Sequence, residues 1–238
     1  MKKIILLFLI VVSTGSLMAQ GLISGRLYLG AKASYGSVDF SSTNNNVENF
    51  AERTYKNISY GAVAGYKLTS SISIQVEGLY TQYSGNSIKY DHLYSENNPL
   101  LTSSDPNSSV DHIDMDLYYF DIPVIAKYHL VEGAFSPYIY AGINWGINTS
   151  DYTTITRKYV DNNTTLYREF TDEIFEQIKY NDMAPIIGAG FNVDLLGKIS
   201  AFGDFRFKYG VKNISNVQNG LGFRNNALWL SAGLVYNL

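Results

Sequence analysis

The sequence contains no cysteine, which excludes disulfide bonds and the cysteine of a lipoprotein signal. Charged residues are few, at 16% of the chain against 46% hydrophobic residues. Beyond the N-terminal segment, no apolar run approaches the roughly 18 residues that indicate a membrane-spanning helix. The formal net charge is −3. It argues against a nucleic-acid partner, because nucleic acids are bound by basic surfaces.

The N-terminus has the pattern of an export signal. Met1-Lys2-Lys3 is basic, residues 4–12 are apolar, and small residues lead to Ala19. The apolar run is too short for a spanning helix, which needs about 20 residues. We therefore expect a signal peptide over residues 1–19, cleaved before Gln20, and one mature domain over residues 20–238.

Eight later segments can each supply the roughly 9–11 residues of a tilted transmembrane strand. Most alternate apolar and polar residues with period two. In the last one, Leu230, Leu234, Tyr236 and the terminal Leu238 share one face. The predicted strands cover Gly25–Val38, Asn57–Leu68, Ser71–Tyr83, Asp114–Leu130, Ser136–Asn148, Asp182–Leu195, Lys198–Val211 and Ala227–Leu238.

The connections between these segments alternate between long and short. Four are long and polar: residues 39–56, 84–113, 149–181 and 212–226. Three are short: residues 69–70, 131–135 and 196–197. Short turns on one side and long loops on the other are typical of bacterial outer-membrane barrels. The sequence thus predicts an eight-stranded antiparallel up-and-down transmembrane β-barrel. Its short turns would face the periplasm, and its last strand would pair with the first.

Three segments resemble a known family. Residues 119–128, Tyr-Phe-Asp-Ile-Pro-Val-Ile-Ala-Lys-Tyr, look like the "Y-x-E-I-P-x-L-x-K-Y" strand of the outer-membrane β-barrel domain proteins called the porin family or PorT-like proteins. Residues 136–142 are similar to the "P-Y-x-x-x-G" strand, and residues 204–210 to the "x-x-R-Y-x-x-G" strand. The resemblance implies a small barrel of the OmpA type in a Gram-negative outer membrane. It implies no single activity, because the family is functionally mixed.

The polar faces of the strands predict a charged lumen. In a membrane barrel the apolar faces meet lipid and the charged faces point inward. An eight-stranded barrel is just wide enough for side chains to fill, so inward charges must pair. We expect Glu77, Asp121 and Asp204 to pair with some of the basic residues Lys32, Lys67, Lys127 and Arg206. A packed lumen argues against an open channel, since open channels belong to larger barrels.

No catalytic or metal-binding motif is present. His92, His112 and His129 lack the spacing of a zinc site. The run Asp111-His112-Ile113-Asp114-Met115-Asp116 has three carboxylates but lacks the glycine and terminal glutamate of an EF-hand loop. We therefore expect no enzyme activity, no cofactor and no metal.

The expected function is a structural or binding role in the cell outer membrane. Two alternatives remain: a passive conduit for small solutes or lipids, and an accessory barrel of a protein secretion system, as the PorT-like resemblance implies. The expected partners are outer-membrane lipid and lipopolysaccharide, the barrel-assembly machinery, and an extracellular or envelope protein bound by the long loops. Within the loop at residues 149–181, we expect Tyr167–Tyr180 to form a short strand extension or a helical turn.

Overall fold

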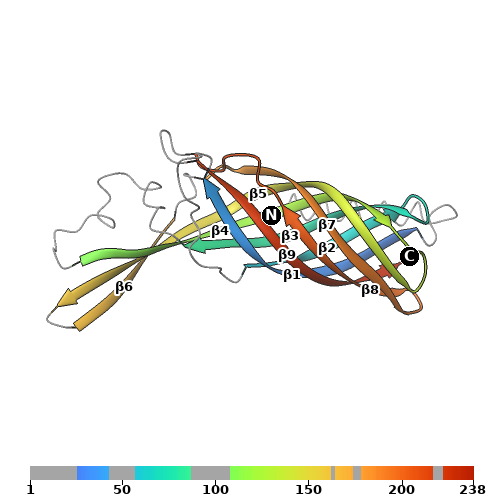
Figure 1. Ribbon diagram of the computed structural model, residues 1–238, viewed down its shortest axis with the longest axis horizontal. Helices are drawn as coiled ribbons and strands as arrows, with labels where there is room; N and C mark the ends of the chain where they lie inside the picture. The colour runs from blue at the N-terminus through green and yellow to red at the C-terminus, as the bar shows by residue number, and fades with distance from the viewer. Residues whose placement is uncertain (1–25, 43–56, 87–107, 162–163, 174–177, 217–221) are drawn as a thin grey trace, which may run out of the picture.

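The computed structural model describes residues 26–42, 57–86, 108–161, 164–173, 178–216 and 222–238. The predicted signal peptide and His92 lie outside these residues. Among the described residues, no helix is long and apolar enough to cross a membrane. The described chain is built of antiparallel strands wrapped around a single axis (Figure 1).

Eight strands form a closed ring, as the sequence predicts. Each pairs antiparallel with its neighbours in the order β1-β2-β3-β4-β5-β7-β8-β9 and back to β1. A ninth strand, β6, pairs only with the outer part of β5. The strands are β1 (Leu27–Ser42), β2 (Asn57–Lys67), β3 (Ile72–Asn86), β4 (Ser108–His129), β5 (Phe135–Asp161), β6 (Thr164–Glu173), β7 (Asn181–Leu196), β8 (Ile199–Lys208) and β9 (Phe223–Asn237).

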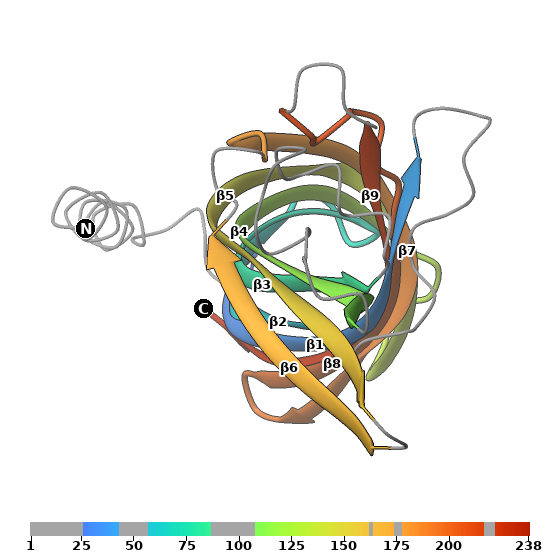
Figure 2. The ribbon, with the colours of Figure 1, turned by 90° about the vertical axis from the view of Figure 1, so that its left-hand side faces the viewer.

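The connection expected at residues 149–181 is the main difference from the sequence prediction. Instead of a long polar loop, β5 continues to Asp161 and returns as β6, forming a hairpin beside the start of β4. The strand extension expected within Tyr167–Tyr180 begins earlier, at Thr164, and its ladder ends at Glu173. This hairpin projects beyond the rim of the barrel, at the end opposite the short turns (Figures 1 and 2).

The last strand closes the barrel. β9 pairs with β1 from Tyr28↔Asn237 to Ser42↔Phe223, so both strands that would otherwise be sheet edges are paired. The predicted outward face of β9 is exposed, with Leu230 at 67% and Leu234 at 54% of their full accessible area. In a membrane barrel this is the face that meets lipid.

The outward face of β4 marks the height of the membrane. Phe120, Val124 and Tyr128 are exposed, and Tyr118 lies further along the same face. Ten positions separate Tyr118 from Tyr128, or about 33 Å along the strand. With a strand tilt of about 40°, this gives a band about 25 Å tall between Tyr118 and Tyr128, which matches the apolar band of outer-membrane barrels. The row at the level of Tyr118 is continuous across four strands and consists of Tyr60, Tyr80, Tyr118 and Tyr152.

Beyond Tyr118, towards the extracellular end, the outward face of β4 becomes polar and the inward face becomes apolar. The alternation of inward and outward positions itself is unchanged. The outward residues Asp114 and Asp116 are polar, whereas the inward residues Met115 and Leu117 are fully buried. The inward residues belong to an apolar cluster that fills the extracellular end of the barrel. Its members are Val38, Phe40, Tyr83, Ile113, Met115, Leu117, Tyr119, Ile155, Ile178, Ile214, Phe223, Ala227 and Trp229. This end is therefore built like a water-soluble protein, and the exchange at Tyr118 marks the edge of the lipid.

One carboxyl group is buried at this apolar end. Asp151 pairs in register with Leu117 and is fully buried, and its Oδ1 accepts a hydrogen bond of 2.7 Å from the side-chain amide of Asn148. Desolvation by burial raises the pKa of Asp151 to about 7.

We predict that this shift makes the barrel less stable as the pH rises. The folded state holds a proton on Asp151 that the unfolded chain loses near pH 4, so the stabilisation is complete below pH 4 and is lost by about pH 7. Asp151→Asn should remove this contribution to the slope and raise the free energy of unfolding at pH 8 by about 1–3 kcal/mol. Urea unfolding of the refolded barrel at pH 5 and pH 8 measures this. An unchanged slope in the variant would contradict it.

Large lumen side chains lie opposite glycines on the neighbouring strands. Tyr140 on β5 pairs in register with Gly188 on β7, and a Cβ at Gly188 would lie 2.3 Å from the Tyr140 ring. The same arrangement places Tyr138 beside Gly190. These glycines leave the space that the tyrosine rings occupy.

Candidate functional site in the barrel lumen

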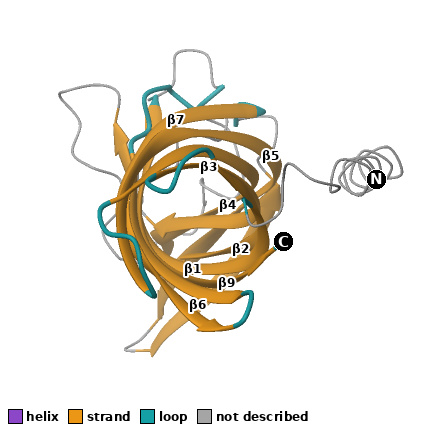
Figure 3. Ribbon diagram, turned by 90° about the vertical axis from the view of Figure 1, so that its right-hand side faces the viewer, coloured by secondary structure: helices purple, strands orange, loops and turns teal. Residues whose placement is uncertain are grey.

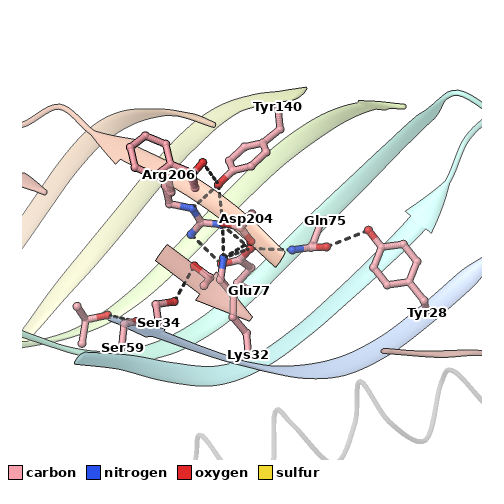
Figure 4. Close-up of polar contacts among 12 residues, drawn as sticks. Tyr28, Lys32, Ser34, Ser59, Gln75, Glu77, Tyr140, Asp204 and Arg206 are labelled. Atoms are coloured by element: carbon pink, nitrogen blue, oxygen red, sulfur yellow. Dashed lines mark hydrogen bonds and ion pairs between the residues drawn. The ribbon is translucent and has the colours of Figure 1, made fainter. Parts of the chain in front are cut away.

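Glu77 is at the centre of a buried charged cluster halfway along the lumen (Figure 4). Both terminal nitrogens of Arg206 donate to its carboxylate, at 2.8 and 2.6 Å. Lys32 Nζ lies 3.6 Å from the same carboxylate, and the side-chain amide of Gln75 donates to it at 2.7 Å. This bidentate contact fixes the orientation of both side chains more firmly than a single hydrogen bond does.

Asp204 is the second anion of the cluster. Lys32 Nζ donates to it at 3.0 Å, and the hydroxyl of Tyr140 donates at 2.9 Å. Arg206 Nε in turn donates to the Tyr140 hydroxyl at 3.1 Å. The cluster therefore joins β1, β3, β5 and β8 across the interior.

A second polar group lies closer to the extracellular end. Lys208 Nζ donates to Asp182 at 2.8 Å and to the hydroxyl of Tyr83 at 3.2 Å. That hydroxyl donates to Asp121 at 2.6 Å, and the Asn144 amide donates to the other oxygen of Asp121 at 2.7 Å. The cavity beside these two groups is only about 20 Å³, which is room for about one water molecule.

Together the two groups fill the middle of the lumen. Burying charges costs several kcal/mol per ion unless they are paired and hydrogen-bonded. The charges of both groups have ion-pair or hydrogen-bond partners, but one carboxylate oxygen of Asp182 has no hydrogen bond among the described residues. The apolar cluster closes the lumen above them. Among the described residues, side chains fill the lumen from this level to the extracellular end.

Comparison with known proteins identifies the family. The model of the family "Outer membrane protein beta-barrel domain" matches residues 18–216. The chain belongs to this family. Membership implies a location in the outer membrane and confirms the resemblance of its strands to the outer-membrane β-barrel domain proteins. No curated protein matches this outer-membrane barrel in sequence.

Solved structures of other outer-membrane barrels are similar to this one. Neisserial surface protein A has a TM-score of 0.47 and 15% identity, covering 89% of this chain and 97% of that one. OprG from Pseudomonas aeruginosa has a TM-score of 0.46 and 10% identity, covering 91% and 97%. The outer-membrane protease OmpT from Escherichia coli has a TM-score of 0.42 and 10% identity, covering 93% and 99%.

Of the seven residues expected in the lumen network of this outer-membrane barrel, four form a cluster and three do not. Lys32, Glu77, Asp204 and Arg206 meet in one cluster. The remaining three do not join it: Asp121 is bonded to Tyr83 and Asn144, Lys127 lies against aromatic rings, and Lys67 Nζ reaches Asn237 at 3.4 Å near the periplasmic rim.

Sequence reasoning did not assign the Lys208–Asp182 pair or the tyrosine hydroxyls that link the charges. Lys208 shares the inward face of β8 with Asp204 and Arg206, and this signal was visible in the sequence. The sequence could not show which tyrosines point into the lumen, because tyrosines also form the outer aromatic row.

The remaining histidines lie apart from the cluster. His112 is extracellular and contacts Asp111 at 2.9 Å and Asp114 at 3.4 Å. His129 is near the periplasmic end, hydrogen-bonded to Ser73 and Ser136. Within the described residues, no three His, Cys, Asp or Glu side chains are grouped so as to hold a metal ion.

Proposed function

We propose that this barrel is a closed, non-catalytic scaffold of the Gram-negative envelope that presents its β5–β6 hairpin to a protein partner outside the cell. The observation that carries the proposal is the length of β5. It continues for 14 residues past Ile147, while a membrane crossing requires only about 9–11 residues. The extra length is not needed to cross the membrane.

The hairpin has the features of a binding surface. Leu166 and Tyr167 on β6 are exposed, at 51% and 54%. Among the described strands, β6 pairs with β5 alone, so its second edge is open for strand addition by an extended segment. Charged residues Arg168 and Glu169 follow directly and supply polar contacts.

The filled lumen supports a scaffold rather than a conduit. The buried Glu77–Arg206 pair lies across the middle of the interior, and the apolar cluster lies above it. Planar bilayers with the purified chain are expected to show no stable open-channel currents. Stable channels would instead favour the conduit.

A photo-cross-linking experiment tests the proposed partner and its side of the membrane. A benzophenone amino acid replaces Tyr167 on the hairpin or Glu132 on a periplasmic turn, and intact cells of the source bacterium are irradiated. We expect a discrete protein adduct from position 167 only. Adducts from position 132 alone would support the alternative of an accessory barrel in secretion, and none from 167 would contradict the proposal.

A variant with a shortened hairpin tests whether the partner binds the hairpin itself. Removing residues 156–169 and joining Ile155 to Phe170, which are cross-strand partners, through an Asn-Gly turn preserves the register. We predict that the shortened barrel still migrates differently in gels before and after boiling, and that irradiation from a benzophenone at Thr171 gives no adduct. An adduct with the same yield as from Thr171 in the full-length barrel would show that the partner does not bind residues 156–169.

A further inference from the structure

The periplasmic end of the lumen contains a cavity of about 310 Å³. Its lining includes turn residues Ser70 and Gly133, which places its mouth at the end of the barrel seen in Figure 3. Short turns face the periplasm in outer-membrane barrels, so the cavity opens on that side. The charged cluster around Glu77 lies deeper in the lumen.

Lys127 lines this cavity and is 4% exposed. Among the residues that the structure describes, no side chain forms an ion pair or a hydrogen bond with its ammonium group. Its contacts are with ring faces: Nζ lies 4.4 Å from the centre of the Tyr138 ring and 5.4 Å from that of Phe202. Such contacts stabilise a cation by about 0.5–2 kcal/mol, less than burial of the charge costs.

The carboxylates of the neighbouring cluster already have ion-pair partners of their own. Lys32 and Arg206 already match its two carboxylates, Glu77 and Asp204. Lys67, Glu132 and Asp194 also line the cavity, and within the described residues none of them forms an ion pair with Lys127. Asp121 lies six residues away on the same strand and is held by Tyr83 and Asn144.

The rest of the cavity has both polar and apolar walls. Gln75, Ser136 and Asn192 provide hydrogen-bonding groups. Tyr28, Phe202 and Val235 pack together as an apolar wall. The carboxylates Glu132 and Asp194 are at the rim, and Asp194 accepts a hydrogen bond of 2.7 Å from Ser200.

We propose that this cavity binds a small organic carboxylate from the periplasm, with the carboxylate on Lys127 and an apolar body against Tyr28, Phe202 and Val235. The carboxylate gives the ammonium group of Lys127 an anionic partner, and the apolar wall selects against a small, fully hydrated anion. The site is independent of the proposed hairpin function, because it is at the opposite end of the barrel.

Titration of the refolded barrel in micelles tests the site, followed by NMR of the lysine Cε groups and backbone amides. The probes are benzoate, acetate and inorganic phosphate. We expect benzoate to give saturable shifts of the Lys127 Cε signal, with a dissociation constant on the order of 1 mM, and at least fivefold weaker binding of acetate. Tighter binding of phosphate than of benzoate would overturn the assignment to a carboxylate.

Variants at Lys127 and at a control lysine distinguish binding in the cavity from a general effect of charge. Lys127→Met should weaken benzoate binding at least tenfold, and Lys127→Arg should retain it. Lys198→Met is the control, since Lys198 is an exposed lysine on a periplasmic turn outside the cavity. If Lys127→Met does not refold, the wild-type Cε shift decides alone. A shift that is absent or linear up to 50 mM benzoate overturns the proposal, as does equal affinity in Lys127→Met.

Discussion

Replacing Glu77 with glutamine is expected to lower the free energy of unfolding by about 3–5 kcal/mol, the usual loss when one partner of a buried ion pair is removed. Arg206 would lose both of its charged hydrogen bonds, and Lys32 would keep only Asp204. Glutamine has nearly the shape of glutamate, so the loss would be electrostatic rather than due to a new cavity. Urea unfolding of the barrel in detergent, followed by tryptophan fluorescence, measures it.

Two further variants show whether the loss comes from unpaired charge. Glu169→Gln changes an exposed glutamate on β6 and should alter stability by no more than about 0.5 kcal/mol. The double variant Glu77→Leu with Arg206→Met removes both charges and should recover at least half of the loss, because no unpaired ion then remains at that contact. A loss below about 1 kcal/mol in Glu77→Gln would mean that water reaches the cluster.

Arginine at position 124 is the second large expected effect. Val124 is exposed on the outward face of β4, close to halfway between Tyr118 and Tyr128. An arginine on the lipid face at the bilayer midplane costs about 2–4 kcal/mol. Val124→Arg should therefore lower the free energy of unfolding by that amount when the barrel is refolded into lipid vesicles.

The matched control is Thr154→Arg, on the outward face of β5 beyond the row of tyrosines. Thr154 pairs in register with Asp114, at the height where the outward face has become polar. Thr154 shares an exposed hydrogen bond of 3.2 Å with Thr171, so this substitution should change stability by no more than about 1 kcal/mol. Equal costs at the two positions would show that the lipid boundary does not lie at Tyr118.

The strands of the barrel were predictable because one physical requirement controls them all. Every spanning strand must present apolar residues to lipid on alternate positions, and the phase persists along its length, as on β4 from Tyr118 to Tyr128. The alternation of loop lengths then gave the ring. The β5–β6 hairpin was predicted only in part: a strand extension was one of two expectations within Tyr167–Tyr180, but the continuation of β5 was not expected. The segment Tyr152–Val160 is nevertheless rich in Thr, Ile, Tyr and Val and is followed by Asp161-Asn162-Asn163, a turn sequence.

The pairing of the lumen charges was less predictable. Sequence shows which residues point inward but not their relative height, because height depends on the stagger between neighbouring strands. Lys127 and Asp121 share one face of β4, yet they contact different groups. Glu77 and Arg206 are 129 residues apart in the chain and meet only once the ring is closed.

The position of Lys32 has a consequence for the seam where the two ends of the chain meet. Lys32 on β1 reaches Asp204 on β8, passing over β9, whose lumen residues at this height are Ser231 and Gly233. β9 has no charged residue at this height, but its two neighbours, β1 and β8, are joined across it by this ion pair. Lateral opening between β1 and β9 must therefore break a buried ion pair as well as a ladder of hydrogen bonds. β1 and β9 are the one pair of neighbouring strands in the ring that no connecting segment links directly. The ion pair between Lys32 and Asp204 therefore stabilises the barrel at this pair of strands.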